Sequence, residues 1–411
     1  MAIENKTETP GGHLSMLTAL PPDPLLGLMA AFRADERVHK LDLGVGVYRD
    51  ENGDTPIMTA VEKAEQKLLS LVSTKAYEGP RGNAEFCQVV CQKILGEDAL
   101  TKTRRETLDA FATPGGCGAL GLGVGFLKRL RPNAKVWVSN PSWPNHQKIV
   151  DVAGLTPAKY TYHRNENNDV DFEQLEHDLV ASTAGDAVII QGPCHNPTGL
   201  DLSVAQWKSL AKVIKDKNLF PFIDIAYQGF GAGLDEDMLG IRAFLDEVDE
   251  ALVSYSCSKN FGLYRDRCGC LILQAATQEV RDAAGTHIAD IARATYSMPP
   301  AHGPAIVATI LADKDLTTEW LEELTMMRER MITLRSQFAR ELEKCGKPKT
   351  AATIRSEKGM FSLLPIKEGA AARLRRDHGI YLPASGRINI AGMTEEKISE
   401  AASVLASEVD E

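Results

Sequence analysis

The sequence predicts an α/β protein, in which helices enclose a mostly parallel β-sheet, with a second, smaller α+β domain. Between about residues 107 and 275, short β-rich runs alternate with Gly/Pro/Asn loops and longer helical stretches, which is the chain order of a layered α/β domain. These runs are mostly apolar and do not alternate with polar residues, as expected for strands buried on both faces of a parallel sheet. After about residue 315 the sequence pattern changes and predicts one long helix and a few short strands.

Six apolar runs and one amphipathic segment define the predicted large domain. The runs expected to be strands are 108–112, 136–139, 187–190, 219–225, 251–255 and 270–273. Between two of them, residues 203–217 carry apolar side chains at positions 204, 207, 210, 211 and 214, the spacing of an amphipathic helix. Upstream, residues 25–32 read as a helix and residues 41–49 as a strand.

The C-terminal part of the chain predicts the second domain. Residues 316–346 form one long helical pattern that Gly346 and Pro348 end. Strand candidates at 359–365 and 386–391 and a helix at 395–407 follow, and segment 41–49 is assigned to the same domain. The predicted organisation of the 411 residues is an N-terminal arm (1–19), a small domain (20–55 with 316–411) and a large domain (56–315).

Composition and charge exclude several classes of protein. The chain is 44% hydrophobic and 25% charged, values of a globular fold and not of a disordered or fibrous chain. Its 46 Lys and Arg against 56 Asp and Glu give a net charge of −10, whereas a nucleic-acid-binding protein usually has a basic excess. No stretch of about 19 residues is continuously apolar, so no membrane span is expected. An acidic protein should also repel an acidic small substrate. A function with such a substrate would therefore need positive charge at the binding site.

The N-terminus and the cysteines predict a cytoplasmic protein. Residues 1–15 contain Glu4 and Glu8 and lack the apolar core of a secretory signal. The eight cysteines include no Cys-x-x-Cys pair and no Cys/His cluster with zinc spacing, so no metal site is expected. Thiols that are neither paired nor metal-bound are typical of a reducing compartment.

Two polar residues stand at the ends of apolar runs, where ligands bind in open α/β sheets. Asp224 nearly closes the run 219–225, with Tyr227 three residues after it, and a carboxylate buried there needs a cation or hydrogen-bond donors. Lys259 stands just beyond the run 251–255. Buried lysines are rare, and a desolvated lysine with a lowered pKa can form a Schiff base with a carbonyl group. Taken singly, a helix cap explains Asp224 as well as a functional role does, and a surface position is the more common explanation of an isolated lysine such as Lys259.

A glycine-rich segment after the run 108–112 predicts an anion-binding site. It reads TPGGCGAL over 113–120 and precedes a helix, so that backbone N–H groups can approach an anion at the positive helix end. Residues 116–121 also match Gly-x-Gly-x-x-Gly, the pattern of dinucleotide-binding proteins. That pattern requires an acidic residue at the end of the next strand, where this chain has Ser139 and Asn140, which argues against NAD or FAD.

Two loops that follow strands, 140–146 and 191–199, contain Asn-Pro pairs, which allow cis peptide bonds. Trp143 in the first loop suits either stacking on a flat cofactor or ordinary packing. His146 and Asn196 suit either ligand binding or a purely structural role. The residues alone leave these alternatives open.

The order and number of the motifs decide between these alternatives. The chain contains SNPSWPNH (139–146), HNPTG (195–199), DIAYQGF (224–230), SKNFGLYRDRCG (258–269), YSMPPAHG (296–303) and ASGRINIAGM (384–393). With these motifs it resembles, over about residues 14–409, the class I, fold-type-I pyridoxal-phosphate aminotransferases, and specifically the aspartate aminotransferase group with its aromatic-amino-acid relatives. The resemblance implies a large domain with a mostly parallel seven-stranded sheet between helices, and a small α+β domain.

The resemblance implies catalytic roles for Lys259, Asp224 and Tyr227. Lys259 would bind the cofactor, pyridoxal 5′-phosphate, covalently and then, as a free amine, move the proton of the substrate. Asp224 would keep the pyridine nitrogen protonated, so that the ring withdraws electrons, and His146 would lie behind it. Tyr227 and Asn196 would donate hydrogen bonds to the phenolic oxygen of the cofactor.

The resemblance also implies the residues that hold cofactor and substrate. Those expected at the cofactor, besides the ones above, are Gly115, Gly116, Cys117, Ser256, Ser258, Arg267, Trp143 stacked on the ring, and Tyr77 of the partner subunit. Those expected at the substrate are Gly46, Trp143, Asn196, Arg387 for the α-carboxylate, and Arg293 of the partner subunit for the distal carboxylate. Two subunits would complete each site, so a homodimer is expected. The acidic net charge would not prevent binding of acidic ligands, since surface charges are screened beyond about 8 Å. The phosphate and the two carboxylates would be bound by the local arginines Arg267, Arg293 and Arg387.

The expected reaction is amino transfer from L-aspartate to 2-oxoglutarate, giving oxaloacetate and L-glutamate by a ping-pong route through the pyridoxamine form of the cofactor. Arg293 favours dicarboxylic substrates, and an aromatic-amino-acid transaminase on the same scaffold is the alternative. Another pyridoxal-phosphate reaction, such as β-elimination or decarboxylation, and an inactive binding module are more distant alternatives.

Two residues depart from the family pattern. Cys117 replaces a Thr or Ser hydroxyl at the phosphate, and the weaker thiol donor predicts a loss on the order of 1 kcal/mol in cofactor affinity. Met298 replaces a usually polar residue near Arg293, which bears on side-chain selectivity.

Overall fold

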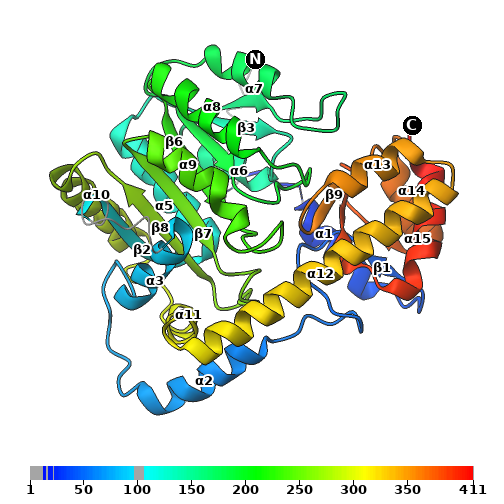
Figure 1. Cartoon of the computed structure of the whole chain (residues 1–411), viewed down its shortest axis with the longest axis horizontal. Helices are drawn as coiled ribbons and strands as arrows, with labels where there is room; N and C mark the ends of the chain where they lie inside the picture. The colour runs from blue at the N-terminus through cyan, green and yellow to red at the C-terminus, as the bar shows by residue number, and fades with distance from the viewer. Residues whose placement is uncertain (1–12, 15–16, 22, 97–105, 411) are drawn as a thin grey trace, which may run out of the picture.

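The chain folds into a large and a small lobe that one long helix, α12 (Lys314–Lys344), connects (Figure 1). The computed structural model describes residues 13–14, 17–21, 23–96 and 106–410. Much of the predicted N-terminal arm, residues 1–19, therefore lies outside the described residues. The predicted domain boundaries at residues 55 and 315 stay a prediction.

A seven-stranded sheet forms the centre of the large lobe, with the strand order β2-β8-β7-β6-β5-β3-β4. Its strands are β2 (Leu108–Pro114), β3 (Lys135–Asn140), β4 (Thr156–Thr161), β5 (Ala187–Gln191), β6 (Phe220–Ile225), β7 (Ala251–Ser256) and β8 (Cys268–Gln274). β8 runs antiparallel to β2 and β7, and the other neighbours pair in parallel. The predicted mostly parallel sheet is confirmed, and each of the six apolar runs lies on a strand.

β4 is the strand of this sheet that the sequence did not predict. It lies at the edge of the sheet and reads TPAKYT. Most of its residues are exposed or only half-buried. An edge strand with partial cover does not need a continuous apolar run, which explains why the pattern that marks the central strands is missing.

Helices cover both faces of the sheet because successive residues of a strand point to opposite sides. In β5, Ile189 packs in one hydrophobic cluster with α5 (Gly115–Leu130), whereas Ile190 packs in another cluster with α8 (Val204–Asp216). The remaining helices of the large lobe are α2 (Thr59–Leu71), α3 (Ala84–Leu95), α6 (Pro144–Val152), α7 (Phe172–Val180), η1 (Glu236–Met238), α9 (Leu239–Glu247), α10 (Gln278–Thr295) and α11 (His302–Ala312).

The small lobe has a hydrophobic core of its own. The second half of α12 forms it together with α13 (Pro348–Ser356), α14 (Ala370–His378) and α15 (Glu395–Glu408). Two short strand pairs complete the lobe: β1 (Leu41–Asp42) runs parallel to β10 (Ile380–Tyr381), and β9 (Phe361–Leu363) runs antiparallel to β11 (Arg387–Asn389), which η2 (Ile390–Gly392) follows. α1 (Pro24–Ala34) contacts this lobe through the ring of Phe32, whose centre lies 5.3 Å from that of Tyr381.

The predicted strand over 41–49 is wrong beyond its first two residues. The Asp42 carboxylate accepts hydrogen bonds from the backbone N–H groups of Gly44 and Val45. This local side-chain contact turns the chain, as aspartate often does in loops. The turn directs Gly46 toward the space between the lobes.

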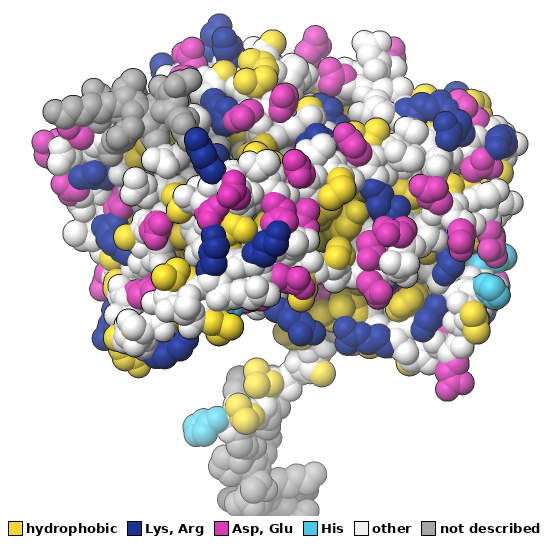
Figure 2. Space-filling view, turned by 60° about the horizontal axis from the view of Figure 1, so that its bottom comes forward, with side chains coloured by type: hydrophobic (Ala, Val, Ile, Leu, Met, Phe, Trp, Pro, Cys, Tyr) yellow, Lys and Arg dark blue, Asp and Glu magenta, His cyan; other side chains and the backbone are white. Residues whose placement is uncertain are grey.

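Positive and negative side chains are intermixed on the surface, as Figure 2 shows for one face. Small hydrophobic areas lie among them. No helix among the described residues has the length and hydropathy to cross a membrane. The same residues include no group of three or more His, Cys, Asp or Glu side chains that could hold a metal ion. All eight cysteines are free thiols.

Candidate active site

A cavity of about 230 Å³ opens at the carboxyl ends of the central strands, between the two lobes. Of the residues predicted from the sequence, it is lined by Gly46, Gly116, Cys117, Trp143, Asn196, Asp224, Tyr227, Ser256, Ser258, Lys259, Arg267 and Arg387. It is also lined by residues that the sequence did not single out: Leu25, Leu120, Gln191, Ala226 and Phe361. Segments more than 300 residues apart in the chain therefore meet in one space.

Asp224 ends β6 in a buried position and is held from behind by two side chains. Its Oδ2 lies 2.8 Å from Nε2 of His146, and its Oδ1 accepts a 3.0 Å hydrogen bond from the hydroxyl of Ser254. Because a carboxylate only accepts hydrogen bonds, Nε2 of His146 carries a proton. Nδ1 of the same ring lies 2.9 Å from the Ser142 hydroxyl. This chain of contacts fixes the direction of the Asp224 carboxylate toward the cavity.

Lys259 follows β7 in a short turn and is half-buried. Its Nζ lies 5.0 Å from the centre of the Tyr227 ring. Burial lowers the pKa of Lys259, and the Asp224 carboxylate works in the opposite direction. A lowered pKa increases the share of neutral amine, which is the form that attacks a carbonyl group or accepts a proton.

An anion-binding cradle lies at the start of α5. No side chain caps this helix end, so its first N–H groups are free to bind an anion. Gly115 has φ +71°, and a Cβ there would lie 2.5 Å from Nη2 of Arg267. A Cβ on Gly116 would lie 3.0 Å from Cβ of Ser256. Only glycine therefore lets the helix end, the hydroxyl of Ser256 and the guanidinium of Arg267 converge.

Arg267 itself adopts a left-handed backbone conformation, with φ +53°. Such a conformation is costly for a residue with a Cβ and tends to occur where function requires it. Nη1 of Arg267 donates to the carbonyl of Tyr264 at 3.1 Å. The backbone geometry and this hydrogen bond aim the guanidinium at the cradle.

Cys117 lies in the first turn of α5, at the edge of the cradle. Burial raises the pKa of its thiol, against the influence of Arg267, so the group is a neutral thiol. Its Sγ accepts a 3.4 Å hydrogen bond from Nδ2 of Asn145. The sequence predicted a weak hydrogen-bond donor at this position, and the structure shows that the sulfur of this thiol also accepts a hydrogen bond from Asn145.

Arg387, at the start of β11 in the small lobe, forms a second cationic site in the cavity. Nη1 donates to Oδ1 of Asn196 at 3.2 Å, and Nη2 donates to the carbonyl of Gly44 at 2.6 Å. Among the described residues, the buried Nε has no hydrogen-bond partner. Burial lowers the pKa of Arg387, and its guanidinium lies 4.5 Å above the ring of Phe361. A buried cation with an unpaired donor suits a carboxylate ligand.

The loop that carries Asn196 is held by Gln191 at the end of β5. Nε2 of Gln191 donates to the Asn196 carbonyl at 2.9 Å, and its Oε1 accepts from the Asn196 N–H at 3.0 Å. The Asn140–Pro141 and Asn196–Pro197 peptide bonds are both cis. Asn196 is thus fixed at the carboxyl edge of the sheet, within reach of Arg387.

The comparisons with known proteins agree with this geometry. Residues 38–405 match the family model described as aminotransferase class I and II. The chain belongs to the aminotransferase class I and II family. It is 45% identical over 384 residues to an aspartate aminotransferase of Salmonella typhi, covering 93% of this chain and 96% of that protein. It is also 45% identical over 385 residues to a tyrosine aminotransferase of Rhizobium meliloti (strain 1021), covering 94% and 97%.

A solved structure extends the similarity to the fold. An aromatic-amino-acid aminotransferase from Burkholderia pseudomallei, covalently bound to pyridoxal phosphate, superposes with a TM-score of 0.93 at 35% identity, covering 97% of this chain and all of that one. The predicted family and fold type are therefore confirmed. This aminotransferase family depends on pyridoxal phosphate.

Four predicted site residues of the aminotransferase do not line the cavity of the single chain. Gly115 and His146 lie directly behind it, beside Arg267 and Asp224, whereas Tyr77 and Arg293 lie at the surface. Tyr77 is 90% exposed. Arg293 is exposed near the end of α10, where Nη1 donates to the Ser297 hydroxyl at 2.8 Å. A hydrogen bond of 3.1 Å from the N–H of Glu78 to the sulfur of Met298 joins the two segments. Tyr77 and Arg293 therefore belong to one surface region of the chain.

The residues that sequence reasoning missed fall into three groups. Ser254 and Ser142 support Asp224 and His146 from behind, and their spacing in the chain gives no signal of this contact. Phe361 and Leu25 contribute apolar walls, which are indistinguishable in sequence from ordinary core residues. Gln191 stood at the start of a recognised loop, and its position at a strand end was the signal that could have identified it.

Proposed function

We propose that this aminotransferase moves the amino group of L-aspartate to 2-oxoglutarate, giving oxaloacetate and L-glutamate in a ping-pong reaction. The observation that carries the proposal is one cavity that holds a half-buried lysine together with two separate anion sites. One site is the α5 cradle with Arg267, and the other is Arg387 with its unpaired Nε. An amino acid and a phosphate-bearing cofactor each need such a site.

The residues present fit pyridoxal 5′-phosphate. The α5 cradle, Ser256 and Arg267 would hold the phosphate, and Asp224 would hold a proton on the pyridine nitrogen. When bound, the cofactor supplies an electron sink for the bond broken at the substrate's Cα. Burial raises the pKa of Tyr227 well above its usual value, so its hydroxyl stays protonated and can donate a hydrogen bond to the cofactor's phenolic oxygen.

Lys259 is proposed as the group that binds the cofactor and moves the proton. Its lowered pKa increases the share of neutral amine, which would accept the proton from Cα and return it to the cofactor carbon on the other side of the amino nitrogen. The Asp224 carboxylate raises the pKa of the amine, and Arg267 and Arg387 lower it. Trp143 would cover the ring, which keeps water away from the reacting carbon.

Arg387 is proposed to bind the α-carboxylate of every substrate. Its guanidinium presents a planar fork that matches a carboxylate, and Asn196 fixes one arm of that fork at 3.2 Å. Gly46 leaves the space beside it open, because a Cβ there would lie 3.1 Å from Cζ of Phe361. A substrate placed in this way presents its Cα to Lys259.

A homodimer is proposed to complete each site. Arg293 of the partner subunit would bind the distal carboxylate, and Tyr77 of the partner subunit would reach the phosphate. Exposed apolar side chains near Tyr77 support an interface there: Leu69, Leu71 and Val72 are 85%, 68% and 46% exposed. Covering such side chains is a common reason for association.

A second candidate is an aromatic-amino-acid transaminase. The apolar walls of the cavity, which include Leu25, Leu120 and Phe361, would accept an aromatic ring. Met298 also places an apolar side chain beside the segment that carries Arg293. These observations favour some acceptance of phenylalanine or tyrosine alongside aspartate.

A substrate panel on the cofactor-loaded enzyme tests the proposal. We expect kcat/KM for L-aspartate with 2-oxoglutarate to exceed that for L-phenylalanine. A higher kcat/KM for phenylalanine would overturn the aspartate assignment in favour of the second candidate. Amino transfer that requires a keto acid, one for one, separates both from elimination or decarboxylation.

A further inference from the structure

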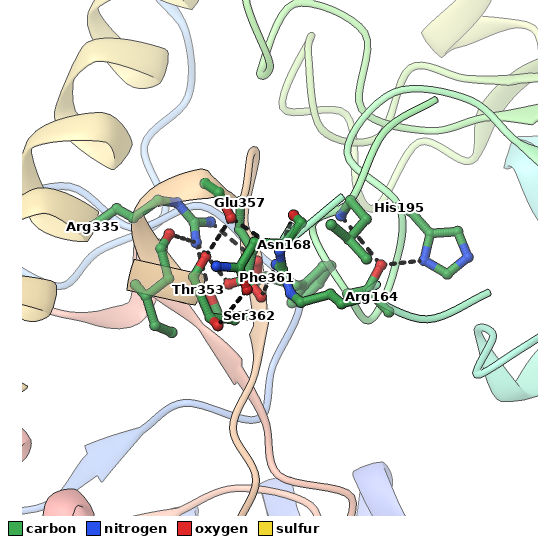
Figure 3. A network of polar contacts seen from close by, with 12 residues as sticks. Arg164, Asn168, His195, Arg335, Thr353, Glu357, Phe361 and Ser362 are labelled. Atoms are coloured by element: carbon green, nitrogen blue, oxygen red, sulfur yellow. Dashed lines mark hydrogen bonds and ion pairs between the residues drawn. The ribbon is translucent and has the colours of Figure 1, made fainter. Parts of the chain in front are cut away.

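A buried ion-pair network joins the two lobes behind the substrate side of the cavity. Glu357, in the small lobe, is 4% exposed. Its Oε1 accepts a 2.8 Å hydrogen bond from Nη2 of Arg164 in the large lobe, and its Oε2 accepts a 3.3 Å bond from Nη1 of Arg335 in α12. Figure 3 shows the Glu357 carboxylate between the two arginines.

Arg335 holds the small-lobe segment that leads into β9. Its guanidinium donates to the carbonyls of Gly359 at 2.7 Å and Phe361 at 3.1 Å, and to the hydroxyl of Ser362 at 2.5 Å. Arg335 is 5% exposed. One side chain of α12 therefore fixes the main chain on both sides of Met360.

Arg164 ties the same segment to the large lobe. Nη1 of Arg164 donates to the carbonyl of Asn168 at 2.7 Å and to the Ser356 hydroxyl at 2.9 Å. The hydroxyl of Thr353 donates to Oδ1 of Asn168 at 3.2 Å. The loop after β4 thus reaches both the end of α13 and Glu357, as Figure 3 shows.

The two lobes approach each other through main chain at this point. The N–H of Lys358 donates to the carbonyl of Gly199 at 2.8 Å. A Cβ on Gly199, whose φ is +65°, would lie 2.8 Å from both Cβ of Glu357 and the carbonyl oxygen of Phe361. Gly199 closes the loop that carries Asn196. The small-lobe segment therefore docks directly on the loop that helps to orient Arg387.

Phe361 transmits the position of this segment to the site. Its ring lies 5.8 Å from that of Tyr227, edge to face, and 4.5 Å below the Arg387 guanidinium. In the β9–β11 pair, Phe361 is opposite Asn389 and Arg387 is opposite Leu363. A shift of the segment would move the surface on which Arg387 rests.

Stability alone is a weak reason for this arrangement. Two buried arginines on one carboxylate lose much of their hydration, and well-packed apolar side chains often stabilise a fold at least as much. A hydrogen-bonded network of fixed geometry does, however, hold the small-lobe segment around Glu357 in one position relative to the large lobe.

We propose that Arg164, acting through Glu357, is a positioning residue for Arg387. The inference rests on the proposed function of Arg387 as the α-carboxylate site. By fixing Glu357 to the large lobe, Arg164 sets the distance between Phe361 and the cofactor side of the cavity. The network thereby determines the position of the Arg387 guanidinium relative to the α-carboxylate of a substrate whose Cα faces Lys259.

The variant Arg164→Met tests the proposal, because it removes the ion pair of Arg164 with Glu357 across the lobes and leaves the Arg335–Glu357 pair. Arg164 is only 18% exposed at its side chain, and methionine keeps most of the apolar stem. We expect KM for aspartate and for 2-oxoglutarate to rise together by about tenfold, less than the ~100-fold that a 1 Å misplacement can cause. The kcat at saturation should change less than twofold, and Arg164→Lys should recover part of the KM change.

Binding of succinate to the cofactor-loaded enzyme, followed by calorimetry, gives a readout without turnover. Its Kd should rise in Arg164→Met by the same factor as KM. The matched control is Arg373→Met, which breaks the Arg373–Glu408 pair inside the small lobe. This control should leave KM and the succinate Kd unchanged, whatever it does to Tm.

Two outcomes would overturn the inference. Unchanged KM and succinate Kd in both Arg164→Met and Glu357→Gln, with a raised KM in Arg387→Lys, would show that Arg387 needs no such support. An equal rise in KM for Arg373→Met would assign the effect to general loosening of the small lobe. Failure of the proposed function is distinct, because the unmodified enzyme would then transfer no amino group from aspartate. If Arg164→Met does not fold, Glu357→Gln carries the same test, because it removes the charge that Arg164 binds, and it should raise KM and the succinate Kd together.

Discussion

Replacing Cys117 by serine should strengthen the binding of pyridoxal phosphate. Cys117 lies in the first turn of α5 beside Arg267, and burial raises the pKa of its thiol, so it enters the phosphate cradle as a neutral, weak donor. Serine has nearly the same shape and a stronger donor. The hydroxyl would point to the same space and add one hydrogen bond to an anionic oxygen.

The expected gain follows from the contacts of this side chain. A hydrogen bond to a charged group contributes about 1.5–3 kcal/mol to stability or binding. Part of that is offset, because the sulfur already accepts a 3.4 Å bond from Asn145, a contact that the shorter serine side chain makes less well. A net gain of ~1 kcal/mol corresponds to about a fivefold lower Kd.

Titration of the apoenzyme with pyridoxal phosphate, followed by absorbance, measures this Kd. Cys117→Ala is the control, since it removes the donor and should bind the cofactor no more tightly than the original thiol. A Cys117→Ser enzyme with an unchanged or higher Kd would refute the reasoning, and would mean that backbone N–H groups and Arg267 satisfy the phosphate without a side-chain donor from α5.

Other predictions concern both ends of the cavity and the fold. Arg387→Lys keeps the charge but loses the planar fork, so KM for each substrate should rise about 30-fold, the equivalent of ~2 kcal/mol; an unchanged KM would exclude Arg387 as the carboxylate site. Ser254→Ala removes a 3.0 Å hydrogen bond to Asp224 and should lower kcat more than it raises KM; the reverse split would contradict the assignment of Asp224 to the cofactor. His195 is buried, which lowers its pKa from 6.5 to about 3. The unfolded chain therefore binds more protons between these values, and stability should fall as pH drops through this window. In His195→Gln the Tm–pH curve should be flatter; parallel curves would contradict the prediction.

The sequence predicted the central sheet because burial on both faces leaves a plain mark in the chain. The runs at 187–190 and 251–255 are apolar at every position except Ser254, and each became a strand. β4 lies at the sheet edge and carries no such mark. The predicted strand over 41–49 failed for a different reason, because the Asp42 side chain competes for the backbone N–H groups that a strand would use.

Site residues were predictable where the family pattern names them, and the contacts that support them were not. Asp224 and Lys259 stand at strand ends, where physical reasoning alone already raised them as candidates. Ser254 behind Asp224 and Arg164 behind Glu357 depend on which surfaces meet in three dimensions. An arginine in a polar loop after an unpredicted strand has no sequence feature that separates it from a solvated surface charge.

The most direct test of the account is the activity of the cofactor-loaded enzyme and of its Lys259→Ala variant with L-aspartate and 2-oxoglutarate. The half-buried amine, which shares one cavity with Asp224 and the two anion sites, predicts rapid formation of oxaloacetate and L-glutamate in equal amounts by the unmodified enzyme. It predicts loss of that activity in Lys259→Ala, with phosphate-dependent cofactor binding retained through Arg267. Undiminished amino transfer by Lys259→Ala, or no transfer from aspartate by the unmodified enzyme, would contradict the account.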